Sequence, residues 1–163
     1  MRRNKQLLSA EETIDILTKG TSGVLAVQGD DDYPYAVPLN YIYYENKIYF
    51  HGAKVGHKLD AIRKQPKASF CVIPQDSVVP EEYTTYSRSV IAFGKIHIIT
   101  EGNDMQYAIH TSATKYHPHD SIENREKVIK REWRPLCMFV LEIEHMTGKE
   151  TIELIRAKKQ QDI

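Results

Sequence analysis

Two short turns constrain the fold of this chain more than any other feature of its sequence. "GDDD" (29–32) separates the strand-like runs "SGVLAVQ" and "YPYAVPLNYIYY", and "ENK" (45–47) separates the second run from "IYFHG". A crossover between parallel strands needs a dozen or more residues, and both turns are far shorter. These neighbouring strands must therefore pair antiparallel, which favours an antiparallel sheet over regular βαβ units.

The rest of the chain adds strands and peripheral helices. Ser9 and Glu12 form a capping box that begins a helix ending near Gly20. A second helical pattern, 54–65, stops before Pro66, and two more occupy 102–117 and 121–133. The polar segment 75–86 is expected to be a loop. Further strand-like runs are "KASFCVIP", "SRSVIAFGKIHII" and "LCMFVLEIEHMTGKE". About six strands predict a mainly β protein, a small antiparallel barrel with flanking helices.

Length and composition indicate a single globular domain. The 163 residues fit one domain (1–163), with a core over 8–150 and a polar tail, 157–163, that is expected to fray. The 22 basic and 22 acidic residues balance, so no overall field attracts nucleic acid or an anionic membrane. No apolar run approaches the roughly 18 residues of a membrane span, and the N-terminus lacks the apolar segment of a signal peptide.

The two cysteines indicate a reducing compartment. Cys71 and Cys137 both lie in apolar strand-like runs. Buried, reduced cysteines in a cytoplasmic protein are the favoured interpretation, and a single disulfide between them is the alternative.

The stretch "IYFHGAKVGHKLD" (48–60) combines the end of a strand with the start of a helix. Strand alternation places Phe50 on one face and His51 on the other. Gly52 and Ala53 then bring bare backbone to the surface, where main-chain N–H groups can approach a planar or anionic ligand. Lys58 lies near the helix start, where amide donors and the helix dipole favour an anion.

These parts suit a phosphate, and two further side chains, Lys54 and His57, add positive potential. The alternative is a solvated helix start without a ligand. Residue types alone do not decide between the two, because the sequence contains neither a Walker A motif nor "GxGxxG".

The preceding strand contains an unusual proline. Pro38 removes an amide donor in "VPLNYIYY" (37–44). An edge left open in this way could offer its remaining main-chain groups to a heteroaromatic ring. The alternative is an edge strand that proline protects against aggregation.

Several of these pieces, taken together and in order, resemble a known family. "PYAVPLNY", "IYFHGAKVGHKLD", "SVIAFGKI" and "LCMFVLEIEHMTGKE" resemble the flavin-binding split-barrel proteins related to pyridoxamine 5′-phosphate oxidase, and most of all the 5-nitroimidazole antibiotic-resistance proteins. The resemblance spans roughly residues 2–150. It implies a six-stranded antiparallel split β-barrel, a homodimer with FMN at the subunit interface, and reduction of a small nitroaromatic or related substrate by the flavin.

The resemblance also implies particular cofactor contacts. Val37, Pro38, Leu39 and Asn40 would run beside the isoalloxazine ring. His51, Gly52 and Ala53 would lie at its other side, Lys58 would hold the phosphate, and Ser89 would contact the cofactor of the same or the partner subunit. His51 would be the catalytic residue: it would orient the substrate, or donate a proton from an imidazole that ordinarily titrates near pH 6.5.

Other functions stay open at the level of sequence. A non-catalytic flavin- or haem-binding protein of stress or storage is one alternative, since seven histidines offer imidazole. Vitamin B6 oxidation is another, although the longer C-terminal segment of true pyridoxamine phosphate oxidases is missing. No metal site is expected, because the histidines of "HTSATKYHPH" (110–119) match no zinc spacing and "DDD" lacks the rest of a calcium loop.

Overall fold

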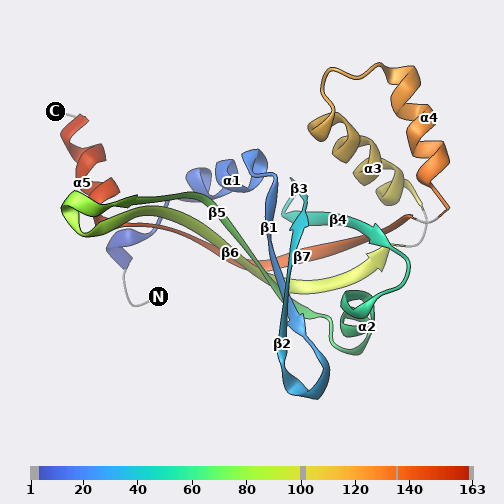
Figure 1. Cartoon of the computed structure of the whole chain (residues 1–163), viewed down its shortest axis with the longest axis horizontal. Coiled ribbons are helices and arrows are strands. Elements are labelled where there is room, and N and C mark those ends of the chain that lie inside the picture. The colour runs from blue at the N-terminus through green and yellow to red at the C-terminus, as the bar shows by residue number, and fades with distance from the viewer. Residues whose placement is uncertain (1–3, 100–101, 135, 162–163) are drawn as a thin grey trace.

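The computed structural model describes residues 4–99, 102–134 and 136–161. Its centre is one strongly curved antiparallel sheet in the strand order β2-β1-β5-β6-β7-β4-β3 (Figure 1). The short turns predicted from sequence are confirmed, because β1 pairs with β2 and β3 with β4 as hairpins. The strands are β1 (Ser22–Gln28), β2 (Pro34–Asn40), β3 (Ile42–Tyr44), β4 (Lys47–Ala53), β5 (Lys67–Val79), β6 (Thr84–Ile99) and β7 (Leu136–Glu150).

Helices lie around the sheet (Figure 1). α3 and α4 form a hairpin at one end of the molecule, and α5 lies at the other end. None of the described helices is long and apolar enough to cross a membrane. The helices are α1 (Ala10–Lys19), α2 (His57–Lys64), α3 (Asn103–Tyr116), α4 (Ile122–Glu132) and α5 (Ile152–Gln161), with 3-10 turns at Asn4–Gln6, Asp30–Asp32 and Pro80–Glu82.

The sheet has seven strands and is open, so the prediction of a six-stranded barrel is wrong in strand number. The run 33–44, expected as one strand, is divided at Tyr41 into β2 and β3. These two strands form opposite edges of the sheet, yet a single residue joins them. The sheet must therefore curl until its two edges approach each other at Tyr41, although no pairing between described residues closes β2 onto β3.

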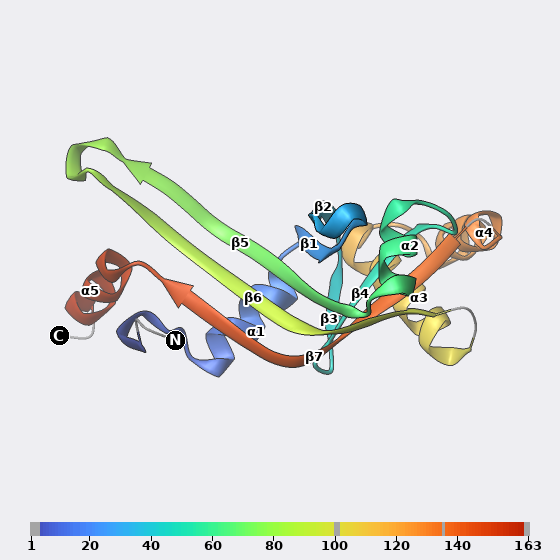
Figure 2. The ribbon, with the colours of Figure 1, turned by 90° about the horizontal axis from the view of Figure 1, so that it is seen from below.

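The segment 75–86, expected as a loop, belongs to a long β-hairpin of β5 and β6. The two strands pair from Val79 and Thr84 inward, and the 3-10 turn Pro80–Glu82 joins them (Figure 2). The prediction failed because it weighed polarity, whereas β-branched residues at 78–79 and 84–85 favour strands. Polar side chains are compatible with this arm because it extends beyond the core into solvent.

Two hydrophobic cores lie on opposite faces of the curved sheet. Inside the curl, Phe50 packs on Phe70 and stacks on Phe139, with ring centroids 5.0 and 5.1 Å apart. Outside it, α3 and α4 cover the outer face of β3, β4 and β7. Residues of the second core are Ile42, Tyr49, Met105, Ala108, Ile109, Ile129, Met138 and Val140. Both faces of β4 and β7 are thus buried over part of their length.

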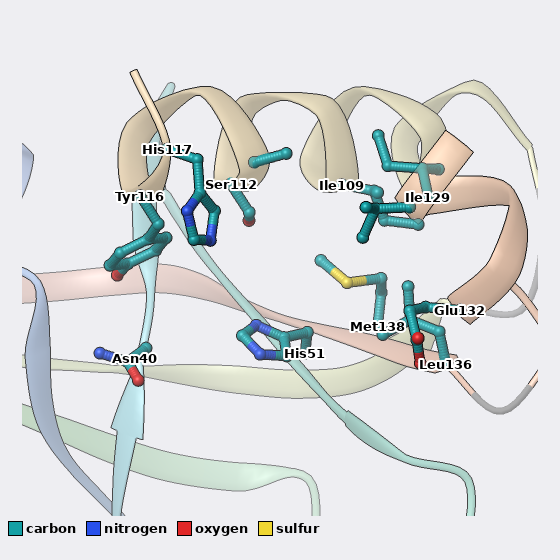
Figure 3. A pocket seen from close by; sticks show the side chains of 12 residues that line it. Asn40, His51, Ile109, Ser112, Tyr116, His117, Ile129, Glu132, Leu136 and Met138 are labelled. Carbon is teal, nitrogen blue, oxygen red and sulfur yellow. The ribbon is translucent and has the colours of Figure 1, made fainter. Parts of the chain in front are cut away.

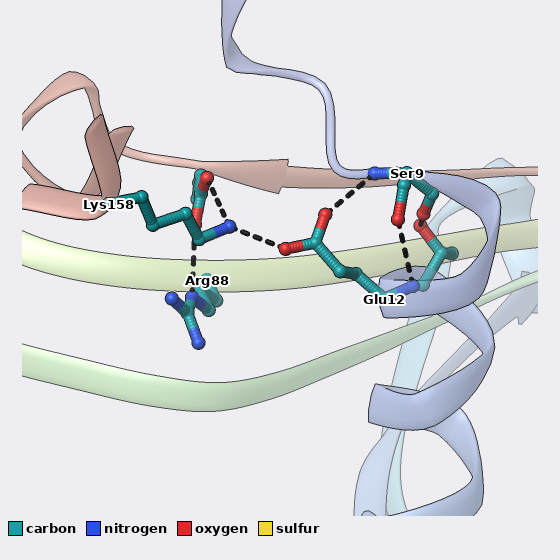
Figure 4. A network of polar contacts seen from close by, with 6 residues as sticks. Ser9, Glu12, Arg88 and Lys158 are labelled. Atoms are coloured by element: carbon teal, nitrogen blue, oxygen red, sulfur yellow. Dashed lines mark hydrogen bonds and ion pairs between the residues drawn. The ribbon is translucent and has the colours of Figure 1, made fainter. Parts of the chain in front are cut away.

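The C-terminal segment forms the helix α5 up to Gln161 and contacts the N-terminal helix α1. The sequence predicted a frayed tail over 157–163 instead. Residues 162–163 of that tail lie outside the described residues. Lys158 Nζ bonds the carboxylates of Glu12 and Glu150, and Arg88 Nε lies 3.1 Å from Glu150 (Figure 4). The hydrogen bond from Lys158 lowers the pKa of Glu12 to about 2. The predicted capping box of Ser9 and Glu12 is confirmed in the same network.

The cysteines are both free, as predicted. Cys137 is buried, and Cys71 is half-buried in β5. Burial raises the pKa of each thiol, so both are protonated at neutral pH.

Candidate functional site

An opening in the curved sheet brings together most of the residues singled out from the sequence. β3 pairs only with Lys47–Tyr49 of β4, so the same edge of β4 lacks a strand partner from Phe50 to Ala53 within the described chain. The outer edge of β2 is also free, and β2 contacts β4. Val37–Asn40 and His51–Ala53 therefore lie at the two sides of a split between strand edges, where main-chain groups are available to a ligand.

The side chains on the β2 side of the split alternate. Val37 and Leu39 are half-buried and pack against the inner core, while Pro38 and Asn40 are exposed. Asn40 Nδ2 donates a hydrogen bond to the carbonyl oxygen of Thr21 at 2.9 Å, which fixes the amide at the end of the strand. A ligand at this edge would thus meet main chain, Pro38 and Asn40 rather than the apolar side chains.

His51 faces the outer side of the sheet, opposite Phe50, as the strand alternation predicts. It pairs in register with Met138 of β7, and both side chains line a cavity beneath α3. The ring is exposed to this cavity, yet the protein atoms around it still lower the pKa of His51 through desolvation, and the positive charge of Lys58 adds to the effect. The pKa of His51 therefore lies below the ordinary value near 6.5, which favours the neutral imidazole at pH 7.

Lys58 lies beside Gly52, on the other side of β4 from His51. A Cβ atom at Gly52 would be 3.2 Å from Lys58 Cε and 3.6 Å from Nζ, so the bare glycine leaves room for the lysine side chain. The side chain is half-buried, and no described carboxylate lies within ion-pair distance of its ammonium group. Lys58 is therefore a partly desolvated cation at the first turn of α2, and it has no counterion among the described residues.

Other predicted parts of the site lie elsewhere. His57 points to the β1–β2 hairpin, where Nδ1 is 3.4 Å from Asp30 and the ring contacts Tyr35 edge to face. It therefore does not join Lys58. Lys54 is exposed in the loop before α2. Val55, in the same loop, is 80% exposed.

Ser89 lies far from His51 within one chain. Ser89 of β6 pairs with Lys149 of β7. His51 pairs with Met138 of β7, and Met138 in turn pairs with Ile99 of β6, so these three residues form one row across the sheet. At roughly 3.3 Å per residue, about 30 Å of strand separates Ser89 from that row. Within one subunit, Ser89 does not reach the split.

A cavity of about 530 Å³ opens next to the split, between the sheet and the α3–α4 hairpin (Figure 3). The sequence analysis does not predict it, because the helices that form its roof follow His51 by more than fifty residues. Asn40 and His51 belong to both the cavity and the split. The lining residues are Asn40, His51, Ile109, Ser112, Ala113, Tyr116, His117, Val128, Ile129, Glu132, Leu136 and Met138.

The C-terminal end of α3 holds the corner at which β2 becomes β3. The Tyr41 amide donates to the hydroxyl oxygen of Tyr116 at 3.1 Å, and this hydroxyl lies 2.7 Å from the carbonyl oxygens of Thr21 and Tyr41. Lys115 Nζ donates to the carbonyl of Gly20 and lies 5.0 Å from the centre of the Tyr41 ring. α3 therefore positions the Asn40 end of the split. Sequence reasoning missed Lys115 and Tyr116, since only the tertiary structure shows that this helix end meets Tyr41.

The described residues contain no group of three or more His, Cys, Asp or Glu side chains that could hold a metal ion. The candidate site therefore suits an organic anion. It combines an open pair of strand edges with an ammonium group that has no described ion-pair partner, and an imidazole beside a largely apolar cavity.

Comparison with known proteins gives a family and a set of similar structures. A family model described as pyridoxamine 5′-phosphate oxidase matches residues 9–150. A search of curated proteins finds no match. Many solved structures have a similar fold, and three of them are compared with this chain. For a proposed 5-nitroimidazole antibiotic resistance protein from Bacteroides thetaiotaomicron, the TM-score is 0.74 at 18% identity, covering 89% of this chain and 86% of the other.

The second structure, a conserved hypothetical protein from Mycobacterium tuberculosis, has a TM-score of 0.79 at 18% identity, covering 93% of this chain and 91% of the other. The third, an FAD-binding protein from Mesorhizobium loti, has a TM-score of 0.65 at 24% identity, covering 90% and 97%. With sequence identities of 18–24%, these three structures show that the fold is shared and nothing more.

Proposed function

Because the chain belongs to the pyridoxamine 5′-phosphate oxidase family, we propose that it is an FMN-dependent oxidoreductase that reduces a small nitroaromatic or related compound. The observation that carries the proposal is Lys58, a half-buried ammonium that no carboxylate of the described chain pairs with, directly beside the bare backbone of Gly52. A phosphate would supply the missing counterion, and the free edges of β2 and β4 would flank a ring next to it. The FAD-binding and nitroimidazole-resistance relatives support the choice of a flavin and of the substrate class.

Each residue of the site has a role in this proposal. Lys58 and the first amides of α2 would hold the phosphate. Main-chain groups of Val37–Asn40 and His51–Ala53 would bind the ring edges, and the neutral imidazole of His51 would hydrogen-bond the substrate or, once protonated, give it a proton. A bound reduced flavin supplies the electrons to the substrate. A phosphate at Lys58 would offset the charge that disfavours protonated His51, and would thereby raise the pKa of His51 toward its ordinary value.

The cavity argues against vitamin B6 oxidation as the activity of this chain. Among the described residues that line it, none is a lysine or an arginine. The phosphate of a pyridoxamine phosphate substrate would therefore lose its hydration without gaining a cationic partner there.

We also propose that the protein is a two-fold homodimer. Val24, Ile91 and Phe93 project from the exposed face of β1, β5 and β6, and each remains 36–40% exposed. Cys71 of β5 pairs with Val24 on one side and with Ile91 on the other, so the three residues lie side by side across the sheet. Phe93 lies two residues further along β6, on the same face. A second copy on this face would cover them, and would bring a second Ser89 toward the first subunit's site. We expect a dimer by light scattering at micromolar concentration, and a monomer that still holds cofactor would contradict this arrangement.

The absorption spectrum of the purified protein, with mass spectrometry of the released ligand, tests the cofactor. We expect flavin bands and the mass of FMN. A Soret band would indicate haem instead, and a flavin that does not turn over any nitroaromatic with a reductant would indicate a binding protein rather than an enzyme.

A further inference from the structure

We propose that the cavity beneath α3 and α4 binds the second substrate, and that it selects uncharged, planar aromatic compounds of two or more fused rings. The identification of the occupant as a substrate rests on the proposed flavin function. The preference of the cavity for such compounds rests on its own walls.

The size of the cavity exceeds what a single small ring needs. Its volume of about 530 Å³ lies within the roughly 300–1,000 Å³ typical of small-molecule sites. Figure 3 shows Ile109, Ile129, Leu136 and Met138 gathered toward one end, on α3, α4 and β7. These side chains form apolar walls on both sides of the cavity, so an extended ring system would bury more apolar surface there than a single ring.

Half of the twelve lining residues carry a polar side-chain group, and these groups suit an uncharged ligand; they are Asn40, His51, Ser112, Tyr116, His117 and Glu132. Asn40, Tyr116 and His117 lie at the opposite end from the apolar side chains (Figure 3). The one carboxylate of the described lining, Glu132, is already paired with Arg131 Nε at 2.7 Å. An anionic ligand would therefore find no lysine or arginine among the described lining residues. An uncharged polar substituent could bond His117 or the side-chain carbonyl of Asn40, since Asn40 Nδ2 and the Tyr116 hydroxyl are already bonded to Thr21.

The position of the cavity connects it to the redox site. His51 and Asn40 line both the cavity and the split between β2 and β4. A ring held between Met138 and α3 would lie next to His51 and adjacent to the edge at which the flavin is proposed to bind. The α3–α4 hairpin would thus decide which compounds reach the flavin, while Lys58 and the strand edges hold the flavin itself.

Binding of redox-inert probes tests the selectivity without any turnover. The purified protein with its retained cofactor is titrated by calorimetry with 2-naphthalenemethanol, benzyl alcohol and 2-naphthoate. We expect 2-naphthalenemethanol to bind about tenfold more tightly than benzyl alcohol, because the second ring adds apolar contact, and at least about tenfold more tightly than the carboxylate. Equal affinity for the alcohol and the carboxylate, or for one ring and two, would overturn the proposal.

Two variants on one helix locate the binding. Ser112 is half-buried and points into the cavity (Figure 3). Thr114 is exposed and is not among the lining residues. We expect Ser112→Phe to weaken the binding of 2-naphthalenemethanol by about tenfold or more. Thr114→Phe should leave this affinity unchanged, and both variants should contain the same amount of flavin. If Ser112→Phe fails to fold, Val128→Trp fills the cavity from α4 and is expected to have the same effect.

The outcomes separate this proposal from the proposed function. Loss of flavin in Ser112→Phe would show that the cavity holds the flavin, and would overturn the substrate assignment while leaving flavin binding intact. If the protein retains no flavin, the function proposal fails. If such a protein still binds 2-naphthalenemethanol more tightly than the other two probes, and Ser112→Phe abolishes this binding, the proposed selectivity of the cavity still holds. Equal probe affinities in Ser112→Phe and Thr114→Phe would exclude the cavity as the binding site.

Discussion

Replacing Lys58 by alanine is expected to weaken the binding of FMN by about 10- to 150-fold and the binding of riboflavin by little. The physical reason is the loss of a charge-assisted hydrogen bond, about 1.5–3 kcal/mol, to a phosphate that riboflavin lacks. The half-buried ammonium has no acidic partner among the described residues, so its removal leaves no buried carboxylate unpaired. The measurement is the dissociation constant of each ligand by flavin fluorescence, with the wild-type protein beside the variant.

The matched control for this prediction is Lys54→Ala. Lys54 lies in the loop just before α2 and has the same charge as Lys58, but it is exposed. We expect Lys54→Ala to weaken FMN binding much less than Lys58→Ala does, because an exposed charge acts on the phosphate only through screened long-range attraction. Equal losses of FMN and riboflavin in Lys58→Ala would show that the lysine acts through the local fold of α2 rather than through the phosphate.

Replacing His51 by alanine is expected to lower nitroaromatic turnover per bound flavin by about 10²-fold, the usual lower range for general acid–base catalysis. The fold should persist, because the imidazole faces the cavity and the inner core is formed by Phe50 on the opposite face. Turnover is measured per flavin, with the melting temperature as a check on folding. His97→Ala, at an exposed position on β6, serves as the control variant.

The pH dependence distinguishes proton donation by His51 from a purely positional role. Burial and Lys58 lower the pKa of His51, so the protonated form becomes more populated as the pH falls toward that pKa. If His51 donates the proton, turnover should rise as the pH is lowered from 8 to 6, and this rise should vanish in His51→Ala. A profile that is the same in both proteins would remove His51 from proton transfer, and a large drop in melting temperature would make it a structural residue.

The sequence by itself determined the local features of this protein. The turns at 29–32 and 45–47 are too short for anything but hairpins, the capping box of Ser9 fixes the start of α1, and strand alternation places His51 and Phe50 on opposite faces. Each of these depends on interactions between residues close in the chain, so a reader of the sequence can derive them. The order of its motifs also indicated the family that the comparison of residues 9–150 then established.

The tertiary structure alone decided the features that depend on contacts between distant residues. The break at Tyr41 follows from its bonds to Thr21 and Tyr116, which pull one run of sequence into opposite edges of the sheet. The strands over 75–86 form because each half of the hairpin pairs with the other, which outweighs their polarity. The cavity arises when α3 and α4 pack over β4 and β7, and no pattern within the strand that contains His51 records that packing. The pKa of His51 is lowered by burial and by the charge of Lys58, and both depend on the tertiary structure.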